Sequence, residues 1–146
     1  MPIIHLSDLI VYSIFAQCMI KLHHIAMYVI DLDGAKAFFQ KYFDALPNKL
    51  YHNSKTGLRT YFLSFPDGGE LEIMQHPQVQ ISNNPIHRSG LIHLAVKVGS
   101  REKVNLLTAR FAEDGYKILS GPRITGDGYY ESSIIGFEGN LIEIIE

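Results

Sequence analysis

The chain has 146 residues, which suits one ordinary domain and excludes a second full enzyme domain. Hydrophobic residues make up 47% of the chain and charged residues 19%, so it contains enough apolar mass to bury a core and is not disordered. The formal net charge of -2 gives no attraction to nucleic acid or to an anionic membrane, and we expect neither as a partner.

Residues 9–20 (LIVYSIFAQCMI) form a nearly uncharged apolar run near the start of the chain. The run is shorter than the roughly 20 residues that a transmembrane helix needs, and the Lys or Arg of a signal peptide does not precede it. We expect residues 1–20 to be an N-terminal extension, either a packed element or an over-extended gene start with the domain beginning at Met19. The lone cysteine, Cys18, cannot form an intramolecular disulfide, so the cytoplasm is the expected compartment.

The rest of the chain contains an internal repeat. Residues 22–29 (LHHIAMYV) resemble residues 91–98 (LIHLAVKV), and both segments contain the pattern H-x-A-x-x-V. A segment with apolar residues at helical spacing follows each of them, at residues 32–46 and 100–115. Each of these predicted helices opens beside an Asp or Ser that can cap it.

Strand-type runs with turn punctuation follow each predicted helix. The last of them are residues 70–75 (ELEIMQ), after a PDGG turn, and residues 140–146 (NLIEIIE), after a GFEGN turn. Each half therefore predicts the order β-α-β-β-β, and neither half closes its own sheet. The sequence predicts an α+β fold in which two tandem βαβββ modules form an open, curved, partly barrel-like sheet with the helices outside. We expect a single domain at residues 21–146. Its two modules are residues 21–76 and 90–146, and a polar linker at residues 77–89 joins them.

Strand parity places four possible metal ligands on corresponding faces of the predicted strands. His24 and His93 occupy the same place in the two repeats, and Glu72 and Glu143 each interrupt a densely apolar strand. A carboxylate in such a strand needs solvent, a partner or a metal ion. Two imidazoles and two carboxylates suit a divalent transition metal. The residues therefore predict a metal site, with structural histidines and exposed strand-end carboxylates as the alternative.

The tandem βαβββ arrangement, with His, Glu, His and Glu in that order on four corresponding strands, resembles that of the vicinal oxygen chelate superfamily. Within this superfamily, the chain resembles the glyoxalase I-like proteins most. The resemblance covers about residues 20 to 146 and implies that His24, Glu72, His93 and Glu143 are the metal ligands. It implies one divalent ion for each site, of the kinds that mixed imidazole and carboxylate ligands bind: Zn, Ni, Co, Mn or Fe(II). Members of this superfamily often pair, so it also implies a homodimer.

The resemblance further implies a lyase or isomerase that moves a proton next to a carbonyl group while a metal ion stabilises an enediolate. In glyoxalase I-like enzymes a metal-coordinated glutamate is the base, which makes Glu143 the first candidate and Glu72 the second. The alternative function is that of the bleomycin-resistance proteins of this fold, which sequester a small drug or metabolite without a metal ion.

Two positions depart from the glyoxalase I pattern. Bacterial enzymes of that type place an Arg four residues after the first His and an Asn four residues after the first Glu, both for glutathione. Tyr28 and His76 stand there in this chain, so glutathione specificity is doubtful. We predict Tyr28, His76 and Lys97 as substrate contacts that face the cavity. Residues 125–131 (TGDGYYE) predict a turn followed by a strand, with tyrosines able to line a pocket.

Overall fold

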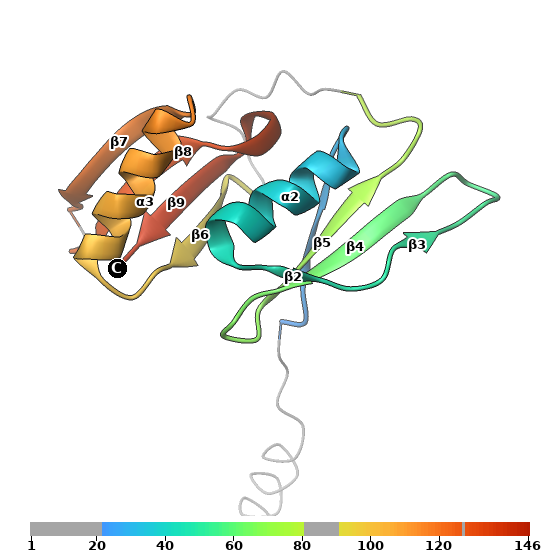
Figure 1. Ribbon diagram of the computed structural model, residues 1–146, viewed down its shortest axis with the longest axis horizontal. Helices are drawn as coiled ribbons and strands as arrows, with labels where there is room; N and C mark the ends of the chain where they lie inside the picture. The colour runs from blue at the N-terminus through green and yellow to red at the C-terminus, as the bar shows by residue number, and fades with distance from the viewer. Residues whose placement is uncertain (1–21, 81–90, 127) are drawn as a thin grey trace, which may run out of the picture.

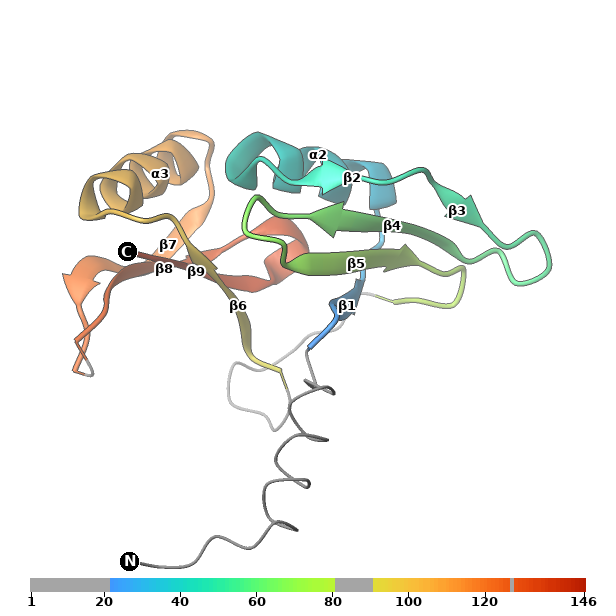
Figure 2. The same ribbon diagram turned by 90° about the horizontal axis from the view of Figure 1, so that it is seen from below.

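A computed structural model describes residues 22–80, 91–126 and 128–146. These residues form two β-sheets, each with one long helix packed on it, and the two helices lie side by side on the same side of the molecule (Figures 1 and 2). The predicted N-terminal extension and most of the predicted linker lie outside the described residues. Within the described ranges, no helix has the length and apolar character to cross a bilayer.

The first half forms a 5-stranded sheet with the strand order β1-β5-β4-β2, in which β3 pairs with β4 and β1 runs parallel to β5. Its elements are β1 (Ile25–Tyr28), α2 (Leu32–Phe43), β2 (Leu46–Pro47), β3 (Tyr51–His52), β4 (Arg59–Ser64) and β5 (Glu70–Gln75). The Gly34 N–H donates a hydrogen bond of 2.9 Å to the Asp31 side chain, which caps α2. The helix ends at Phe43 because Asp44 takes a left-handed conformation with φ of 53°.

The second half forms a 4-stranded sheet with the strand order β6-β9-β8-β7, in which β6 runs parallel to β9. Its elements are β6 (His93–Lys97), α3 (Arg101–Glu113), β7 (Lys117–Ile124), β8 (Tyr130–Ile135), the 3-10 turn η1 (Phe137–Gly139) and β9 (Leu141–Ile145). The Ser100 side chain caps α3 by accepting a hydrogen bond of 3.2 Å from the Lys103 N–H.

The predicted α+β class and the tandem βαβββ order are confirmed, with the short strand β3 as an addition to the first half. The two sheets stay open and do not close into a barrel. Strands β1 and β6 stand at the ends of their sheets, so among the described strands each is hydrogen-bonded on one side only.

Aromatic side chains of the two helices join the halves. Tyr42 of α2 stacks on Phe111 of α3 with a ring-centroid distance of 4.2 Å, and Phe38 lies 5.5 Å from Tyr116. The Tyr42 hydroxyl also donates a hydrogen bond to Asp114. Burial raises the pKa of Tyr42, while the hydrogen bond from Tyr42 is the largest influence that lowers the pKa of Asp114. The helices therefore join the two halves, and among the described strands none of one sheet pairs with a strand of the other.

The turn η1 of the second half supplies a second link, to the start of α2. The carboxylate of Glu138 accepts hydrogen bonds from the backbone N–H of Ile30 at 2.8 Å and of Asp31 at 2.7 Å. Phe137 beside it lies 5.9 Å from Phe38 between ring centroids. A carboxylate at this place satisfies backbone donors next to the helix start and suits the positive end of the helix dipole.

Candidate metal centre

The first sheet carries His24 and Glu72 on the face opposite α2. Leu71 and Ile73 are buried under that helix, so Glu72 between them points to the other face. His24 lies just before β1, in which Ala26 pairs with Glu72. The His24 Nε2 atom is 3.7 Å from the Glu72 Oε2 atom. We call this side of each sheet its ligand face.

The second sheet repeats this arrangement. Ile142 and Ile144 are buried on the α3 side, so Glu143 points to the ligand face, where Ala95 of β6 pairs with it. The Nε2 atom of His93 is 3.4 Å from the Oε2 atom of Glu143. The repeat in the sequence therefore produces two His–Glu pairs of nearly the same geometry.

Each pair has a spacing that fits two ligands of one metal ion. Metal–ligand bonds of about 2.0 to 2.2 Å place neighbouring ligand atoms about 3.0 to 3.5 Å apart, close to both observed separations. The four residues do not come together in one chain, however. Within the described ranges, no group of three or more His, Cys, Asp or Glu side chains is close enough to hold an ion. Each chain thus presents two half-sites, which we define as His24 with Glu72 and His93 with Glu143.

The predicted substrate contacts lie in different parts of the molecule. Tyr28 and Lys97 are exposed on the ligand faces, where they pair with Met74 and Ile145, respectively. His76 follows β5, and its Nδ1 atom accepts a hydrogen bond of 3.2 Å from the Gln78 N–H. It lines a small separate cavity of about 220 Å³.

One neighbour of the half-sites was not singled out from the sequence as functional. The Nδ1 atom of His23 is 2.8 Å from the Nδ1 atom of His24 and 3.7 Å from the Oε2 atom of Glu70. The His24 ring thus has one partner at Nδ1 and another, Glu72, at Nε2. Strand parity alone places His23 and His24 on opposite faces, but the contact forms just before β1 begins, where parity does not apply.

Other polar side chains that the sequence did not single out lie near Glu143, on the ligand face of the second sheet. Ser133 of β8 pairs with Glu143, and Glu131 lies two residues away on the same face. Arg123 of β7 pairs with Glu131. The register of β7 shifts twice before Arg123, so alternation along the sequence does not predict this side chain's face.

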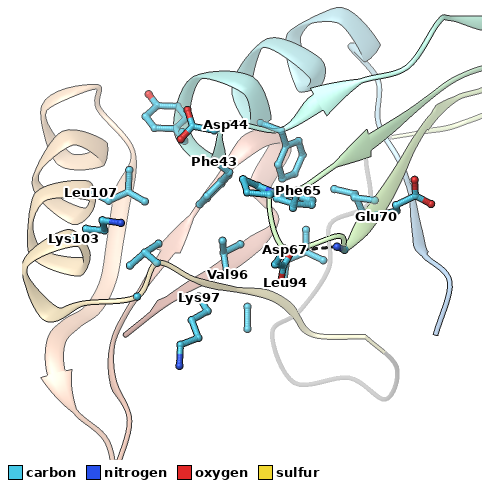
Figure 3. A pocket seen from close by; sticks show the side chains of 18 of the residues that line it. Phe43, Asp44, Phe65, Asp67, Glu70, Leu94, Val96, Lys97, Lys103 and Leu107 are labelled. Atoms are coloured by element: carbon cyan, nitrogen blue, oxygen red, sulfur yellow. Dashed lines mark hydrogen bonds between the residues drawn. The ribbon is translucent and has the colours of Figure 1, made fainter. Parts of the chain in front are cut away.

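A large cavity of about 780 Å³ lies between the two halves, on the side of the helices. Figure 3 shows Phe43, Phe65, Leu94 and Val96 around it, and Lys97, which also lines the cavity, extends its side chain away from these apolar residues. Strand β6 therefore stands between the apolar part of the cavity and the ligand face of the second sheet.

Comparison with known proteins supports this architecture. Residues 21–144 match the Glyoxalase/Bleomycin resistance protein/Dioxygenase superfamily. The uncharacterized protein YqjT of Bacillus subtilis (strain 168) is 30% identical over 114 residues, which cover 75% of this chain and 85% of that protein.

Solved structures share the fold at low sequence identity. A glyoxalase family protein from Bacillus cereus has a TM-score of 0.75 at 16% identity, over 88% of this chain and 95% of that one. The fosfomycin resistance protein FosX from Listeria monocytogenes, solved with Mn(II) and a sulfate ion, has a TM-score of 0.63 at 20% identity, over 88% of this chain and 93% of that one. Because the family match spans most of the sequence and the fold agrees with it, the chain belongs to the Glyoxalase/Bleomycin resistance protein/Dioxygenase superfamily.

Proposed function

We propose that the protein is a cytoplasmic, metal-dependent enzyme of the glyoxalase I-like type, a lyase or isomerase that moves a proton next to a carbonyl group. Its metal ligands are His24, Glu72, His93 and Glu143. The observation that carries the proposal is the pair of matching His–Glu contacts, with Nε2 to Oε2 distances of 3.7 and 3.4 Å, on corresponding strands of the two halves. The relative FosX, whose structure contains Mn(II), supports a divalent ion in this fold.

A homodimer completes the site in this proposal. Two chains related by a two-fold axis can pair β1 of each protomer with β6 of the other, which covers the open sheet edges at β1 and β6 in both chains. The half-site of His24 and Glu72 then meets the partner's His93 and the partner's Glu143. Exposed apolar side chains near the starts of β1 and β6 favour such burial: Leu22 is 81% exposed, Leu91 69% and Ile92 43%.

The chemistry follows from these side chains. A divalent ion, when bound, supplies Lewis-acid stabilisation of the oxygen that becomes negative as a proton leaves the neighbouring carbon. The Oε atoms of Glu143 accept that proton and return it to the adjacent carbon, and Glu72 is the second candidate for the same role. The ligand faces hold the substrate, with Tyr28 and Lys97 as contacts, and His76 is a third contact at the end of β5.

The cavity between the halves favours one alternative function. Its walls include apolar side chains of both halves, such as Phe43 and Val96, and its volume of about 780 Å³ is within the range of small-molecule sites. The alternative is metal-free sequestration of a drug or metabolite, as in bleomycin-resistance proteins. This alternative function predicts tight binding of the small molecule that is unchanged when a chelator removes metal ions.

The first test is the metal content of the tag-free full chain by mass spectrometry, before and after reconstitution with Zn, Ni, Co and Mn. We expect about one ion per chain, as for a site with a complete set of protein ligands, and its loss in the His24→Ala, His93→Ala double variant. Bound metal justifies a screen of glyoxal-type and acyl-CoA substrates. Absence of bound metal under every condition overturns the proposal and favours the binding protein.

A complementation experiment tests whether the site is shared between chains. One variant carries His24→Ala with Glu72→Gln, and the other carries His93→Ala with Glu143→Gln, so neither homodimer contains an intact site. A mixed dimer of the shared type has one intact site and binds about one ion per dimer, because all four ligands are then present once. A site built within one chain stays empty in the mixture, and that result excludes the shared arrangement. Light scattering on the same samples checks that the chain is a dimer at micromolar concentration.

A further inference from the structure

We propose that the substrate carries an anionic group, such as a carboxylate or a phosphonate, that binds Arg123 and Lys97 beside Glu143. The proposal rests on the proposed function of the site and names the class of its substrate. It comes from a row of side chains across the second sheet, which we call the cationic row: Lys97, Ile145, Glu131 and Arg123.

Strand register places the cationic row next to the row that contains Glu143. Lys97 of β6 pairs with Ile145 of β9, Ile145 pairs with Glu131 of β8, and Glu131 pairs with Arg123 of β7. Directly paired residues in a sheet point to the same face. Glu131 is a diagonal neighbour of Glu143, and such neighbours lie about 7 to 8 Å apart. Lys97 is a diagonal neighbour of Glu143 as well, and Arg123 lies one strand, about 5 Å, beyond Glu131. An anionic group bound at this row is therefore within the length of a small molecule from Glu143.

Arg123 is held in place from within the sheet. Its Nε atom donates a hydrogen bond of 2.6 Å to the Ser120 Oγ atom, and its Nη2 atom is 4.0 Å from the Glu131 Oε1 atom. Glu131 is only 8% exposed, so it offers a buried carboxylate behind the half-exposed guanidinium. A guanidinium has five N–H donors in a planar fork, and these two contacts leave donors for a two-point contact with an anion.

Lys97 adds a second cation at the other end of the row. Its side chain is exposed, and within the described residues it forms no hydrogen bond or ion pair. Lys97 lines the edge of the large cavity, and Figure 3 shows its side chain extending away from the apolar residues there, toward the ligand face. The row thus contains two cations against one carboxylate, and the excess positive charge attracts an anion.

The first sheet lacks this charge at the equivalent row. The residues there are Tyr28, Met74, Thr60 and Tyr51, all of them uncharged. On the neighbouring row Phe62 pairs with Glu72, and the His24 ring packs edge-on against Phe62 at 5.0 Å. The two ligand faces therefore differ: the first offers aromatic and apolar contacts, and the second offers positive charge. A substrate with an apolar body and one anionic end matches both.

The test compares an anion with a neutral molecule of the same shape. The probes are 3-phenylpropionate and 3-phenylpropanamide, and the measurement is their dissociation constants by calorimetry and NMR titration. The protein is the metal-free full chain, so that the carboxylate cannot bind through a metal ion. We expect 3-phenylpropionate to bind about tenfold more tightly or better, because a hydrogen bond to a charged group is worth about 1.5 to 3 kcal/mol. Replacing the propionate with 2-phenylethylphosphonate then distinguishes a carboxylate from a phosphonate.

Variants assign the preference to the cationic row. We expect Arg123→Gln and Lys97→Gln each to reduce the preference for the anion, and the double variant to abolish it. Arg101→Gln is the matched control, because Arg101 also pairs with a carboxylate, that of Glu146 at 3.1 Å, but belongs to α3. Thermal unfolding checks that each variant folds.

Equal affinity for the two probes overturns the proposal. A preference for the anion that survives in the double variant also overturns it. Failure of 3-phenylpropionate to bind at millimolar concentration does the same. These outcomes are independent of the metal proposal, because the Arg123→Gln variant keeps all four proposed ligands and its metal content is measured separately.

Discussion

The hydroxyl group of Tyr42 in α2 donates a hydrogen bond of 2.5 Å to the carboxylate of Asp114 at the end of α3, which joins the two halves of the molecule. Lys41 donates to the same carboxylate oxygen at 3.0 Å. These two contacts lower the pKa of Asp114 below its ordinary value of 3.8, and they are made only in the folded chain.

This lowered pKa predicts how stability changes with pH. A carboxyl group whose pKa is lower in the folded state stabilises the fold above the unfolded pKa, and this stabilisation is lost as the pH falls through the folded pKa. We expect the free energy of unfolding of the wild type to exceed that of Asp114→Asn at neutral pH and the difference to shrink below pH 3.8. Urea unfolding at a series of pH values measures it. Tyr42→Phe should show a smaller difference of the same kind, and a gap that stays constant down to pH 2 contradicts the prediction.

The aromatic contact between the helices is the second test of how the halves are joined. Phe111 is 0% exposed and stacks on Tyr42, so Phe111→Ala leaves a cavity between the halves. We expect a loss of about 3 to 5 kcal/mol in the free energy of unfolding. Leu106 of the same helix is 65% exposed, and Leu106→Ala should change the free energy of unfolding by less than about 0.5 kcal/mol. Similar effects for the two variants would argue against the packing described.

Glu138 provides a third prediction, because it caps α2 from the other half of the chain. We expect Glu138→Ala to lower the free energy of unfolding by about 1 kcal/mol, the usual cost of losing a helix cap. Amide hydrogen exchange should accelerate first at Ile30 and Asp31, whose N–H groups lose their acceptor. Glu113→Ala, at an exposed position of α3, is the control. Unchanged exchange at both amides would show that the cap does not form in solution.

The assignment of the base gives a fourth prediction. In the reconstituted protein, we expect Glu143→Gln to slow exchange of deuterium from solvent into the carbon next to the carbonyl of hydroxyacetone by about 100-fold or more, since a positioned base contributes that much. Glu72→Gln should have the smaller effect. NMR follows the exchange, and metal analysis separates loss of the base from loss of the ion. Full exchange in Glu143→Gln would remove Glu143 as the base.

Local structure was predictable because its signals are local. Capping by Asp31 and Ser100 and the helical spacing of apolar residues located both helices to within a few residues of their observed ends. Strand parity also placed Glu72 and Glu143 on the faces opposite the helices, because their neighbours Ile73 and Ile142 are buried under α2 and α3.

The docking of the halves was not predictable in the same way. The contact of Glu138 with Asp31 joins residues 107 positions apart, and no periodic pattern encodes such a pairing. The sequence predicts the GFEGN segment only as a turn before the last strand, whereas its Phe137 and Glu138 contact the first half. The face of Arg123 depends on two register shifts in β7, which alternation cannot anticipate. The separation of the half-sites follows from this docking as well.

The cap on α2 also bears on how the protein is made. A nascent chain emerges from the ribosome with its N-terminus first. Glu138 follows Asp31 by 107 residues, so α2 emerges long before Glu138 is added. The backbone N–H groups at the start of α2 therefore gain their acceptor, and the aromatic residues of α2 are covered, only after the second half has been made. Nascent chains that end before η1 lack the acceptor for the N–H groups of Ile30 and Asp31, so this cap forms only after most of the chain has been translated.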